Sequence, residues 1–551
     1  MDLFKKMLNP KRDTEDYITI DYLIKEFFNG NLSKKEFAEQ TLTTLQNCVD
    51  LKIINNYLDN LMEILKEDNE IEDLLFNYLD QSENPAVKVL IIKILYYNFS
   101  EKFLEVINKI IVPDTLSFIL NTISLLIENK ARYEVLNKKL DLYLQSKYKV
   151  VAEEARAMLS IEAKYQEICI RNGYRLKTFG RKEFREITNK HFIKLNFSDS
   201  IFDELPDCWD KFKFLKELSL TDNPLKAIPD SIYRLAKANF SQKYIDEGVI
   251  FEEADILALL EILTGGRMLK VVEKDILRGI WDARNYKINA NGHITGIAIN
   301  NNEESRIGII PIQLFRLKDL KQLYLTLTDI KLIPNEIKML KSLELLDLQD
   351  NKIDTIPDSL CELIKLKKLD LSYNNIKKIP NRINQLKELE ELILTNNKIE
   401  NIPTSVFSLT SLQILSLGSN EIKLIPDLIN SLINLKTLNL TSNNIKEIPE
   451  TIKSLQNLEI LHLEGNQIED LPEELYRIKT LKFLYLSKNK IKKISSSIES
   501  LNLLKYLFIS DNLIEEIPEL LGNLSSLTLL VIHGNPIKVI PEDIKNKIKI
   551  Y

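Results

Sequence analysis

The sequence is poor in the residues that catalytic and metal-binding motifs require. It has 4 histidines and 4 cysteines among 551 residues, and its 14 glycines form no phosphate-binding loop of the G-x-x-x-x-G-K-[ST] type. The motifs H-E-x-x-H and G-x-S-x-G are also missing. His191, His293, His462 and His533 are far apart in the sequence, and a lone histidine is more often a packed or surface residue than a ligand. We therefore expect a protein that is not an enzyme and that binds no cofactor and no metal.

The sequence also lacks an excess of charge of either sign. Its 74 basic and 80 acidic side chains give a net charge of -6. A chain without surplus positive charge has no field that would attract a phosphate backbone. Nucleic acid is therefore not an expected partner.

Cysteines and long apolar runs are scarce as well. Cys48, Cys169, Cys208 and Cys361 show no C-x-x-C spacing, which argues against a disulfide framework and against a zinc site. No stretch approaches the roughly 18 apolar residues of a membrane-spanning helix, and no apolar signal core follows the first residues. We expect a cytoplasmic protein with no membrane partner.

What the sequence has instead is a strict period in its C-terminal half. Asparagines recur every 23 residues, at Asn351, Asn374, Asn397, Asn420, Asn443, Asn466, Asn489, Asn512 and Asn535. A proline column follows at the same period, at Pro357, Pro380, Pro403, Pro426, Pro449, Pro472, Pro518 and Pro541, with Ser495 in one copy. Self-similarity at a fixed period of this length indicates a solenoid of stacked units. Function is then expected on a surface and not in a pocket.

One copy, residues 343–366, indicates what each unit does. The alternation at Leu346 and Leu348 predicts a short strand with these two side chains inward, while Asp347 points to the opposite face. The asparagine amide is expected to bond backbone groups of its own and of the adjacent repeat. The proline fixes φ where the return segment starts. Stacked copies of this unit predict a curved parallel sheet.

The full pattern, L-x-x-L-x-L-x-x-N-x-I-x-x-I-P, resembles the leucine-rich repeat family in its 23-residue I-P form, which is found in intracellular Ras-pathway scaffolds and many bacterial repeat proteins. The resemblance covers residues 293–551 and implies a solenoid of about eleven strands. Thr328 departs from the pattern at the asparagine position, and Asn302 lies too far from Pro311 by three residues. The implied fold class is an α+β repeat protein, a leucine-rich-repeat solenoid with a curved parallel sheet and a turn-rich convex side.

Two further copies precede this array. Residues 190–235 contain LNFSDSIFDELP and LSLTDNPLKAIP, whose prolines, Pro206 and Pro229, are again 23 residues apart. Residues 236–292 lose the repeat, and the run EEADILALLEIL within them predicts a helix with a buried face. This segment is either a cap that begins the array or a helical insertion in one continuous solenoid.

Residues 1–180 show no such repeat and are predicted to form an all-α domain. The segments NPAVKVLIIKILYY, DTLSFILNTISLLIE and KVVAEEARAML each carry apolar residues at helical spacing. They resemble stacked helical pairs of the HEAT type. An irregular helical bundle would give the same pattern.

The last four repeats carry apolar and aromatic residues where earlier repeats have charged ones. On the sheet face opposite the inward leucines we expect Ile460, His462, Phe483, Tyr485, Tyr506, Phe508, Leu529 and Val531. An exposed cluster of this kind tends to mark an interaction site. The alternatives are that the chain's own end, KNKIKIY, or another domain covers these residues, or that the curvature of the sheet leaves the inner column half-buried. A smaller acidic area is expected at Asp347, Asp350 and Asp370, and the alternating charges of the neighbouring row are expected to pair with one another.

Together these features predict a non-catalytic cytoplasmic scaffold that binds a protein partner on the concave face of the sheet. The family resemblance implies a small GTPase or another signalling protein as the partner. One alternative is a regulator or enzyme whose activity lies in residues 1–180, with the repeats selecting its target. A second alternative is self-association of the array.

Overall fold

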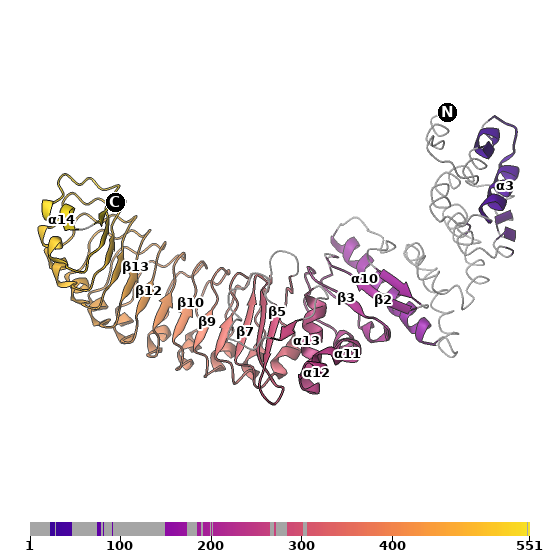
Figure 1. Ribbon diagram of the computed structural model, residues 1–551, viewed down its shortest axis with the longest axis horizontal. Helices are drawn as coiled ribbons and strands as arrows, with labels where there is room; N and C mark the ends of the chain where they lie inside the picture. The colour runs from indigo at the N-terminus through magenta and orange to yellow at the C-terminus, as the bar shows by residue number, and fades with distance from the viewer. Residues whose placement is uncertain are drawn as a thin grey trace. The chain divides into compact units, whose positions relative to one another are not determined.

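The computed structural model (Figure 1) describes the chain in several ranges and divides it into two compact units. Unit 1 comprises Met1–Asn196 and Pro206–Glu217, and unit 2 comprises Phe197–Leu205 and Leu218–Tyr551. The described residues are 22–27, 29–46, 149–172, 185–188, 191–198, 202–264, 269–271, 284–300, 306–547 and 549–551, together with single positions at 74, 75, 77, 78, 81, 91 and 200.

Unit 1 contains helices and a hairpin in its described part. Its elements are α3 (Lys34–Gln46), α10 (Lys149–Asn172), the antiparallel strands β1 (Arg185–Thr188) and β2 (His191–Asn196), and the 3-10 helix η2 (Trp209–Lys211). Helix α10 packs against β2 and η2, and Phe192, Trp209 and Phe212 are fully buried beside it. Two expected features of residues 1–180, the all-α domain and its HEAT-like pairing, lie mostly outside the described residues. The predicted helix KVVAEEARAML lies within α10.

A 14-stranded sheet dominates unit 2. Its strand order is sequential from β17 to β4, and every neighbouring pair is parallel except β5 with β6. In β8 to β16 each residue pairs with the residue 23 positions later, for example Leu392 with Leu415. The strands are β4 (Lys270–Val271), β5 (Arg284–Ile288), β6 (Ile294–Asn300), β7 (Gln322–Thr326), β8 (Leu345–Asp347), β9 (Lys368–Asp370), β10 (Glu391–Ile393), β11 (Ile414–Ser416), β12 (Thr437–Asn439), β13 (Ile460–His462), β14 (Phe483–Tyr485), β15 (Tyr506–Phe508), β16 (Leu529–Val531) and β17 (Lys549–Ile550). This is the solenoid with a parallel sheet that the period predicts, and β6 to β16 supply eleven strands.

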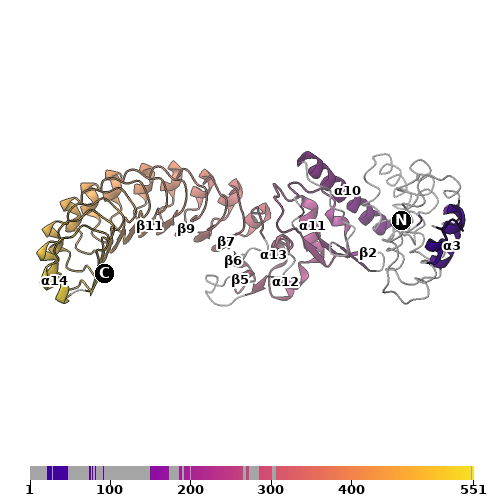
Figure 2. The same cartoon turned by 90° about the horizontal axis from the view of Figure 1, so that it is seen from above.

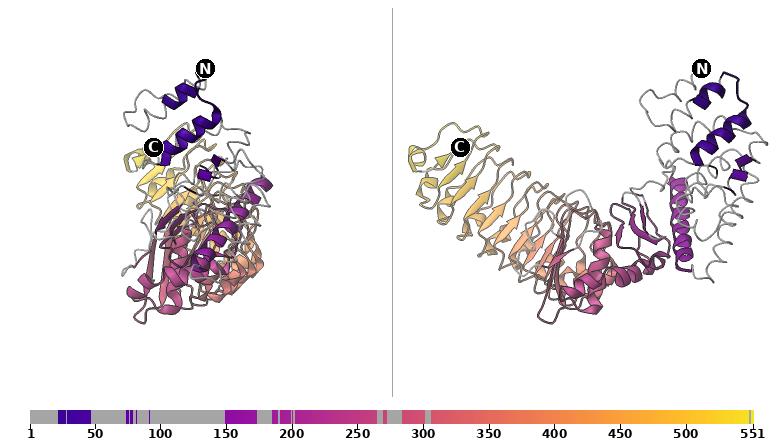
Figure 3. Two further views of the ribbon diagram at one scale, coloured as in Figure 1. Left: turned by 90° about the vertical axis from the view of Figure 1, so that its right-hand side faces the viewer. Right: turned by 45° about the vertical axis from the view of Figure 1, so that its right-hand side comes forward.

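A five-residue 3-10 helix stands on the return side of each repeat. Figure 2 shows these helices along the outer side of the curved array and the strands along its inner side, and Figure 3 shows the strands side by side toward the yellow end. Each helix begins after the proline of the I-P pair, whose φ is near the value that the ring imposes. Ser495 replaces proline before η11 and accepts a hydrogen bond from the backbone N–H of Ser497. The helices are η3 (Ile312–Arg316), η4 (Asn335–Met339), η5 (Asp358–Glu362), η6 (Asn381–Gln385), η7 (Thr404–Ser408), η8 (Asp427–Ser431), η9 (Glu450–Ser454), η10 (Glu473–Arg477), η11 (Ser496–Ser500) and η12 (Glu519–Asn523), with the α-helix α14 (Glu542–Lys547) after the last repeat.

The asparagine column forms a ladder of hydrogen bonds between repeats. The Asn420 amide nitrogen donates to the carbonyl oxygens of Leu394, Leu417 and Gly418 at 3.0, 3.0 and 3.2 Å, and its Oδ1 accepts from the Ile399 N–H at 2.9 Å. One buried side chain therefore satisfies backbone groups in two neighbouring repeats that no strand pairing reaches. Thr328, which lacks the amide, itself donates to Asn351 Oδ1 at 2.9 Å.

The residue before each ladder position has a positive φ. This left-handed conformation turns the chain after the strand, and most side chains adopt it only at a cost in free energy. The residues concerned are Leu327, Asp350, Tyr373, Asn396, Ser419, Ser442, Gly465, Lys488, Asp511 and Gly534.

Helices α11 (Asp230–Asn239), α12 (Gln242–Asp246) and α13 (Phe251–Leu263) lie between the early repeat of unit 2, with β3 (Glu217–Ser219), and the main array. The run EEADILALLEIL lies in α13, which is buried from Glu253 to Leu263.

This region combines features of both alternatives for residues 236–292. The antiparallel pair β5–β6 begins the array as a cap would. Across the interruption, however, the Asp222 N–H donates to the Arg306 carbonyl oxygen at 3.1 Å, and the Gly308 N–H donates to the Thr328 carbonyl oxygen at 2.8 Å. The turns of the early repeat and of the main array are therefore continuous through hydrogen bonds. The strands are not, because β3 belongs to a separate sheet from β4 to β17.

Candidate interaction surface on the inner face of the sheet

The strand register brings all eight residues of the predicted cluster together. Ile460, Phe483, Tyr506 and Leu529 are successive partners across β13 to β16 and form one row. His462, Tyr485, Phe508 and Val531 form the next row on the same strands. Because equal repeats in parallel register keep equivalent residues adjacent, positions 23 apart in sequence become neighbours.

Five of these residues are ring-bearing and contact one another; we call them the aromatic ladder, namely His462, Phe483, Tyr485, Tyr506 and Phe508. His462 stacks on Tyr485 with ring centroids 4.2 Å apart, and Tyr485 stacks on Phe508 at 4.7 Å with the planes only 19° apart. Phe483 meets Tyr506 edge to face at 5.0 Å. Such ring pairs stabilise each other and hold their side chains in place. The surface is thus preorganised.

Seven of the eight residues remain accessible to solvent. Tyr506 is the most exposed of the ladder at 37%, and Ile460, His462, Phe483, Tyr485, Phe508 and Leu529 are half-buried. Strand β17, at the end of the chain, does not lie over them, because it pairs with β16 and forms the edge of the sheet.

Val531 differs from the prediction, which places it in the accessible cluster. It is only 8% exposed, so it does not offer contact area to a partner. Its short side chain follows the larger ring of Phe508 in the row, and the backbone of Tyr551 bonds to the next residue, Ile532, at 2.9 Å. The strand β17 therefore closes the sheet beside this valine.

A half-buried carboxylate lies beside the ladder. Glu464 is hydrogen-bonded to His462 Nδ1 at 3.3 Å and to the Thr441 hydroxyl at 2.9 Å. Burial favours a higher pKa for Glu464, but these hydrogen bonds outweigh it and hold the pKa below its ordinary value. Burial, together with the Glu464 charge, raises the pKa of Tyr485. The ladder therefore carries a neutral phenol next to an ionised carboxylate at neutral pH.

The expected acidic area does not form a surface. Asp347 and Asp370 are each only 4% exposed. Their carboxylates fold back and accept from the N–H groups of Gln349 and Ser372, both at 3.1 Å. Aspartate commonly bonds the backbone two residues on, which a pattern of charges along a strand does not reveal. Asp350 alone of the three is exposed.

The charged side chains in the row beside the ladder form ion pairs with their neighbours in the same row, as expected. Glu344 lies 3.7 Å from Lys321 and 3.6 Å from Lys367, and Lys482 lies 2.8 Å from Glu459. Exposed pairs of this kind contribute little free energy. This row acts mainly to keep the border of the inner face hydrated.

Within the described ranges, no three His, Cys, Asp or Glu side chains gather closely enough to hold a metal ion. Burial raises the pKa of the Cys208 and Cys361 thiols to about 12 in each case, so neither is an activated nucleophile. Among the helices in the described part, none combines the length and apolarity needed to span a bilayer.

A second feature of unit 2 was not singled out from the sequence. It is a groove beside Gly308, Gln313 and Lys331, on the turn side of the first repeats. The one sequence signal was the irregular copy before Pro311, where a glycine occupies a position that is lysine in both neighbouring copies.

Family models match the repeat array. A leucine-rich repeat region matches residues 358–440 and 422–501, and a leucine rich repeat model matches residues 318–376 and 479–537. No curated protein matches the chain in sequence.

Solved structures are similar to the chain at low identity. A leucine-rich repeat protein of Leptospira interrogans is 27% identical, over 65% of this chain and 95% of that chain, with a TM-score of 0.41. An internalin of Listeria monocytogenes is 18% identical, over 75% of this chain and 96% of that chain, with a TM-score of 0.43. A plant peptide hormone receptor, solved in a complex, is 23% identical, over 63% of this chain and 60% of that chain, with a TM-score of 0.44. With the asparagine ladder and the parallel register, the family matches identify residues 318–537 as a leucine-rich repeat array.

Proposed function

We propose that the protein is a non-catalytic scaffold whose array binds a protein partner on the inner face of the sheet, with the aromatic ladder as the main contact. Leucine-rich repeat regions generally mediate protein–protein interactions, and the curvature of solenoids creates extended concave binding surfaces.

The observation that carries the proposal is the stack of His462, Tyr485 and Phe508 on an accessible face. Rings held by their neighbours lose little conformational entropy when a partner covers them, which favours binding. Aromatic side chains are also the residues most enriched among the dominant contacts of protein interfaces.

The partner's contact segment should carry apolar side chains to cover the rings. Lys482 is already paired with Glu459, and Glu464 is already bonded to His462 and Thr441, so the polar border needs no compensating charge. From the family resemblance we retain a small GTPase or another signalling protein as the proposed partner, and the cytoplasm as the proposed compartment.

The test compares two double variants of the full chain as baits in quantitative affinity capture from native lysate. Tyr485→Ala with Phe508→Ala removes two stacked rings, and Ile393→Ala with Ile414→Ala removes two half-buried residues of the same face nearer the start of the array. We expect a partner that is lost with the first pair and kept with the second. Titration of that purified partner should then show binding weakened by roughly 100-fold, or about 3 kcal/mol.

Two results would contradict the proposal. One is capture that is unchanged by the loss of Tyr485 and Phe508. The other is equal loss in both double variants, which would indicate that the whole face, or a general change in folding, is responsible. Circular dichroism of both variants separates these last two explanations.

A further inference from the structure

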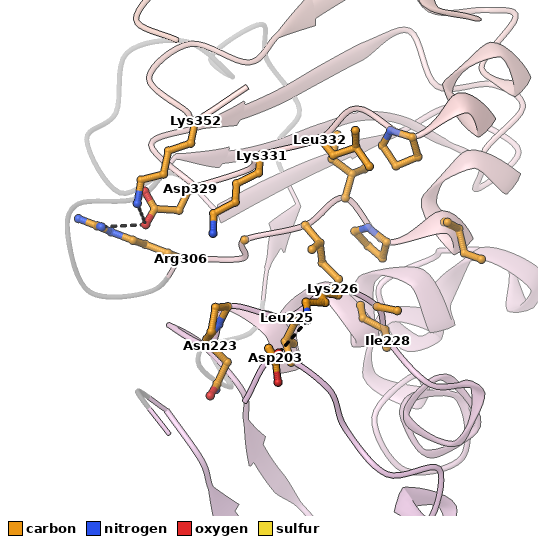
Figure 4. Close-up of a pocket in the computed structure, with 18 of the residues that line it drawn as sticks. Asp203, Asn223, Leu225, Lys226, Ile228, Arg306, Asp329, Lys331, Leu332 and Lys352 are labelled. Carbon is orange, nitrogen blue, oxygen red and sulfur yellow. Dashed lines mark hydrogen bonds and ion pairs between the residues drawn. The ribbon is translucent and has the colours of Figure 1, made fainter. Parts of the chain in front are cut away.

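A groove of about 1210 Å³ lies on unit 2 where the turn segments of three successive copies run side by side (Figure 4). The segments are residues 223–229, 306–311 and 328–334, each ending in the proline of the repeat. The groove belongs to the turn side of the array and is separate from the aromatic ladder.

One of the three copies brings no side chain to the groove. The position three residues before the proline is Lys226, Gly308 and Lys331 in the three copies. Gly308 has a φ of +72°, and a Cβ atom there would lie 3.3 Å from the Asn223 carbonyl oxygen. The glycine therefore lets this turn segment approach the Asn223 carbonyl oxygen closely, and it brings no long side chain to the groove between the two lysine-bearing segments.

The walls of the groove present apolar side chains. Ile309 and Leu332 each lie two residues before the proline of their own copy, and both line the groove. Leu332 is 65% exposed. Ile312, the first residue of η3, is 58% exposed. Three large aliphatic side chains at one groove mark a surface suited to an apolar partner group.

The charges lining the groove pair with one another except for Lys331 and Asp222, and the Asp222 carboxylate accepts instead from the backbone N–H of Arg306 at 3.2 Å. Asp329 Oδ2 accepts from Arg306 at 2.9 Å and from Lys352 at 2.7 Å, and Lys226 pairs with Asp203 at 2.9 Å. Burial acts to raise the pKa of Asp329, but the two cations outweigh it and hold the pKa below its ordinary value. Lys331 has no carboxylate partner among the described residues, and Figure 4 shows it beside the groove between Asp329 and Leu225.

Gln313, one of the residues that line the groove, carries a buried acceptor without a partner among the described residues. Gln313 is 8% exposed, and within the described part of the chain its Oε1 accepts no hydrogen bond. Burying an acceptor without a donor costs stability, so such a group calls for an explanation. A donor supplied by a bound molecule would satisfy it.

We propose that this groove binds an extended peptide segment of a partner protein in which an acidic residue lies next to large aliphatic residues. The acidic side chain pairs with Lys331, the aliphatic side chains pack on Ile309, Ile312 and Leu332, and a peptide N–H donates to Gln313 Oε1. The volume exceeds what most small-molecule sites offer, and a peptide supplies all three kinds of group together. This site is independent of the proposed contact on the inner face.

The chain contains a matched control for the test. The tetrapeptide Lys-Leu-Ile-Pro occurs at residues 331–334 and again at 423–426, and Leu424 is 61% exposed, close to the value for Leu332. The second copy lies outside the groove. Lys331→Ala with Leu332→Ser and Lys423→Ala with Leu424→Ser therefore change the same residues in the same local context.

The probe is a fluorescein-labelled peptide, Gly-Leu-Glu-Leu-Gly, titrated with the full chain by fluorescence polarisation, beside the same peptide with glutamine or lysine at its centre. We expect the glutamate peptide to bind most tightly. Lys331→Ala with Leu332→Ser should weaken the binding of the glutamate peptide by roughly tenfold or more, because a charged contact and an apolar contact are both lost. The 423/424 pair and the Tyr485→Ala, Phe508→Ala variant should leave binding unchanged. Gln313→Leu should weaken all three peptides by a similar factor.

The proposal is overturned if no peptide binds at about 1 mM, or if glutamate and glutamine peptides bind alike. Equal effects of the two Lys-Leu substitutions, or loss of binding in the Tyr485→Ala, Phe508→Ala variant, would overturn it as well. Decanoate serves as a competing aliphatic acid: if it binds with the same dependence on Lys331 while the peptides do not, the occupant is a lipid-like acid and not a peptide.

Discussion

The imidazole of His462 lies flat on the phenol ring of Tyr485, with centroids 4.2 Å apart and ring planes 12° apart. It is the first ring of the row that continues through Phe508, and it ties that row to the half-buried Glu464. His462 therefore connects the exposed rings to a polar group fixed in the next turn.

His462→Ala should remove the end of the stack and lower the free energy of unfolding by about 1 kcal/mol, since a stacked ring pair contributes that much beyond its buried area. His462→Phe should keep most of the stacking. Thermal unfolding of the two variants, followed by circular dichroism, checks the difference. Equal melting temperatures would show that the stack contributes nothing to stability.

The asparagine ladder should be most sensitive in the middle of the array. Asn443→Ala leaves the buried Ile422 N–H without an acceptor, and it removes one of the two amide donors to each of the Leu417 and Leu440 carbonyl oxygens, which keep their bonds to Asn420 and Asn466. We expect a loss of roughly 2 to 4 kcal/mol. Asn535→Ala should cost less, because that side chain is only half-buried and lies in the last repeat. Urea unfolding measures both, and a larger effect at Asn535 would contradict the role assigned to the ladder.

The positive φ of the residue before each ladder asparagine predicts a substitution that stabilises the protein. Lys488 has a φ of 55°, where a lysine is strained and a glycine is not. Lys488→Gly should therefore raise the free energy of unfolding by about 1 kcal/mol. The control is Lys490→Gly, at an exposed residue without a positive φ, which should lower it by roughly 0.5 to 1 kcal/mol. A decrease at both positions would refute the assignment of strain.

A buried carboxyl should make unit 1 less stable as pH rises. Burial raises the pKa of Glu154 to about 8, although the Phe192 N–H donates to it at 3.3 Å. The unfolded chain releases this proton near the ordinary carboxyl pKa, whereas the folded chain keeps it until about pH 8. Stability from this group is therefore present at low pH and is lost as pH rises through that window.

Glu154→Gln should flatten this pH dependence and raise the stability at pH 8 relative to the parent. Urea unfolding between pH 4 and 8, followed by the fluorescence of buried Trp209 in a Trp281→Phe background, provides the measurement. Parallel pH profiles for parent and variant would show that Glu154 does not carry the effect.

Much of the array could be predicted because it depends on local spacing alone. Leucines two residues apart define each strand, and the constant interval of 23 residues sets the register, so Tyr485 had to lie between His462 and Phe508. No long-range information was needed for that adjacency.

The remaining features depend on contacts that a repeat pattern does not contain. Val531 is buried because the last residues of the chain form β17 beside β16. Asp347 is buried because its carboxylate accepts from the backbone N–H of Gln349. The groove arises where the period is broken, and only the structure shows that Gly308 follows directly after the turn of Asn223.

The uniform register has a consequence for how such a chain changes in length. Because each unit bonds to the next in the same way, duplicating or deleting one whole unit between residues 351 and 443 would leave every junction intact. It would move the strands that carry the aromatic ladder, which lie toward the yellow end of Figure 1, closer to the Lys331 groove or farther from it, by about 4.8 Å per strand. The reach between two contact regions is thus adjustable in fixed steps without altering either one.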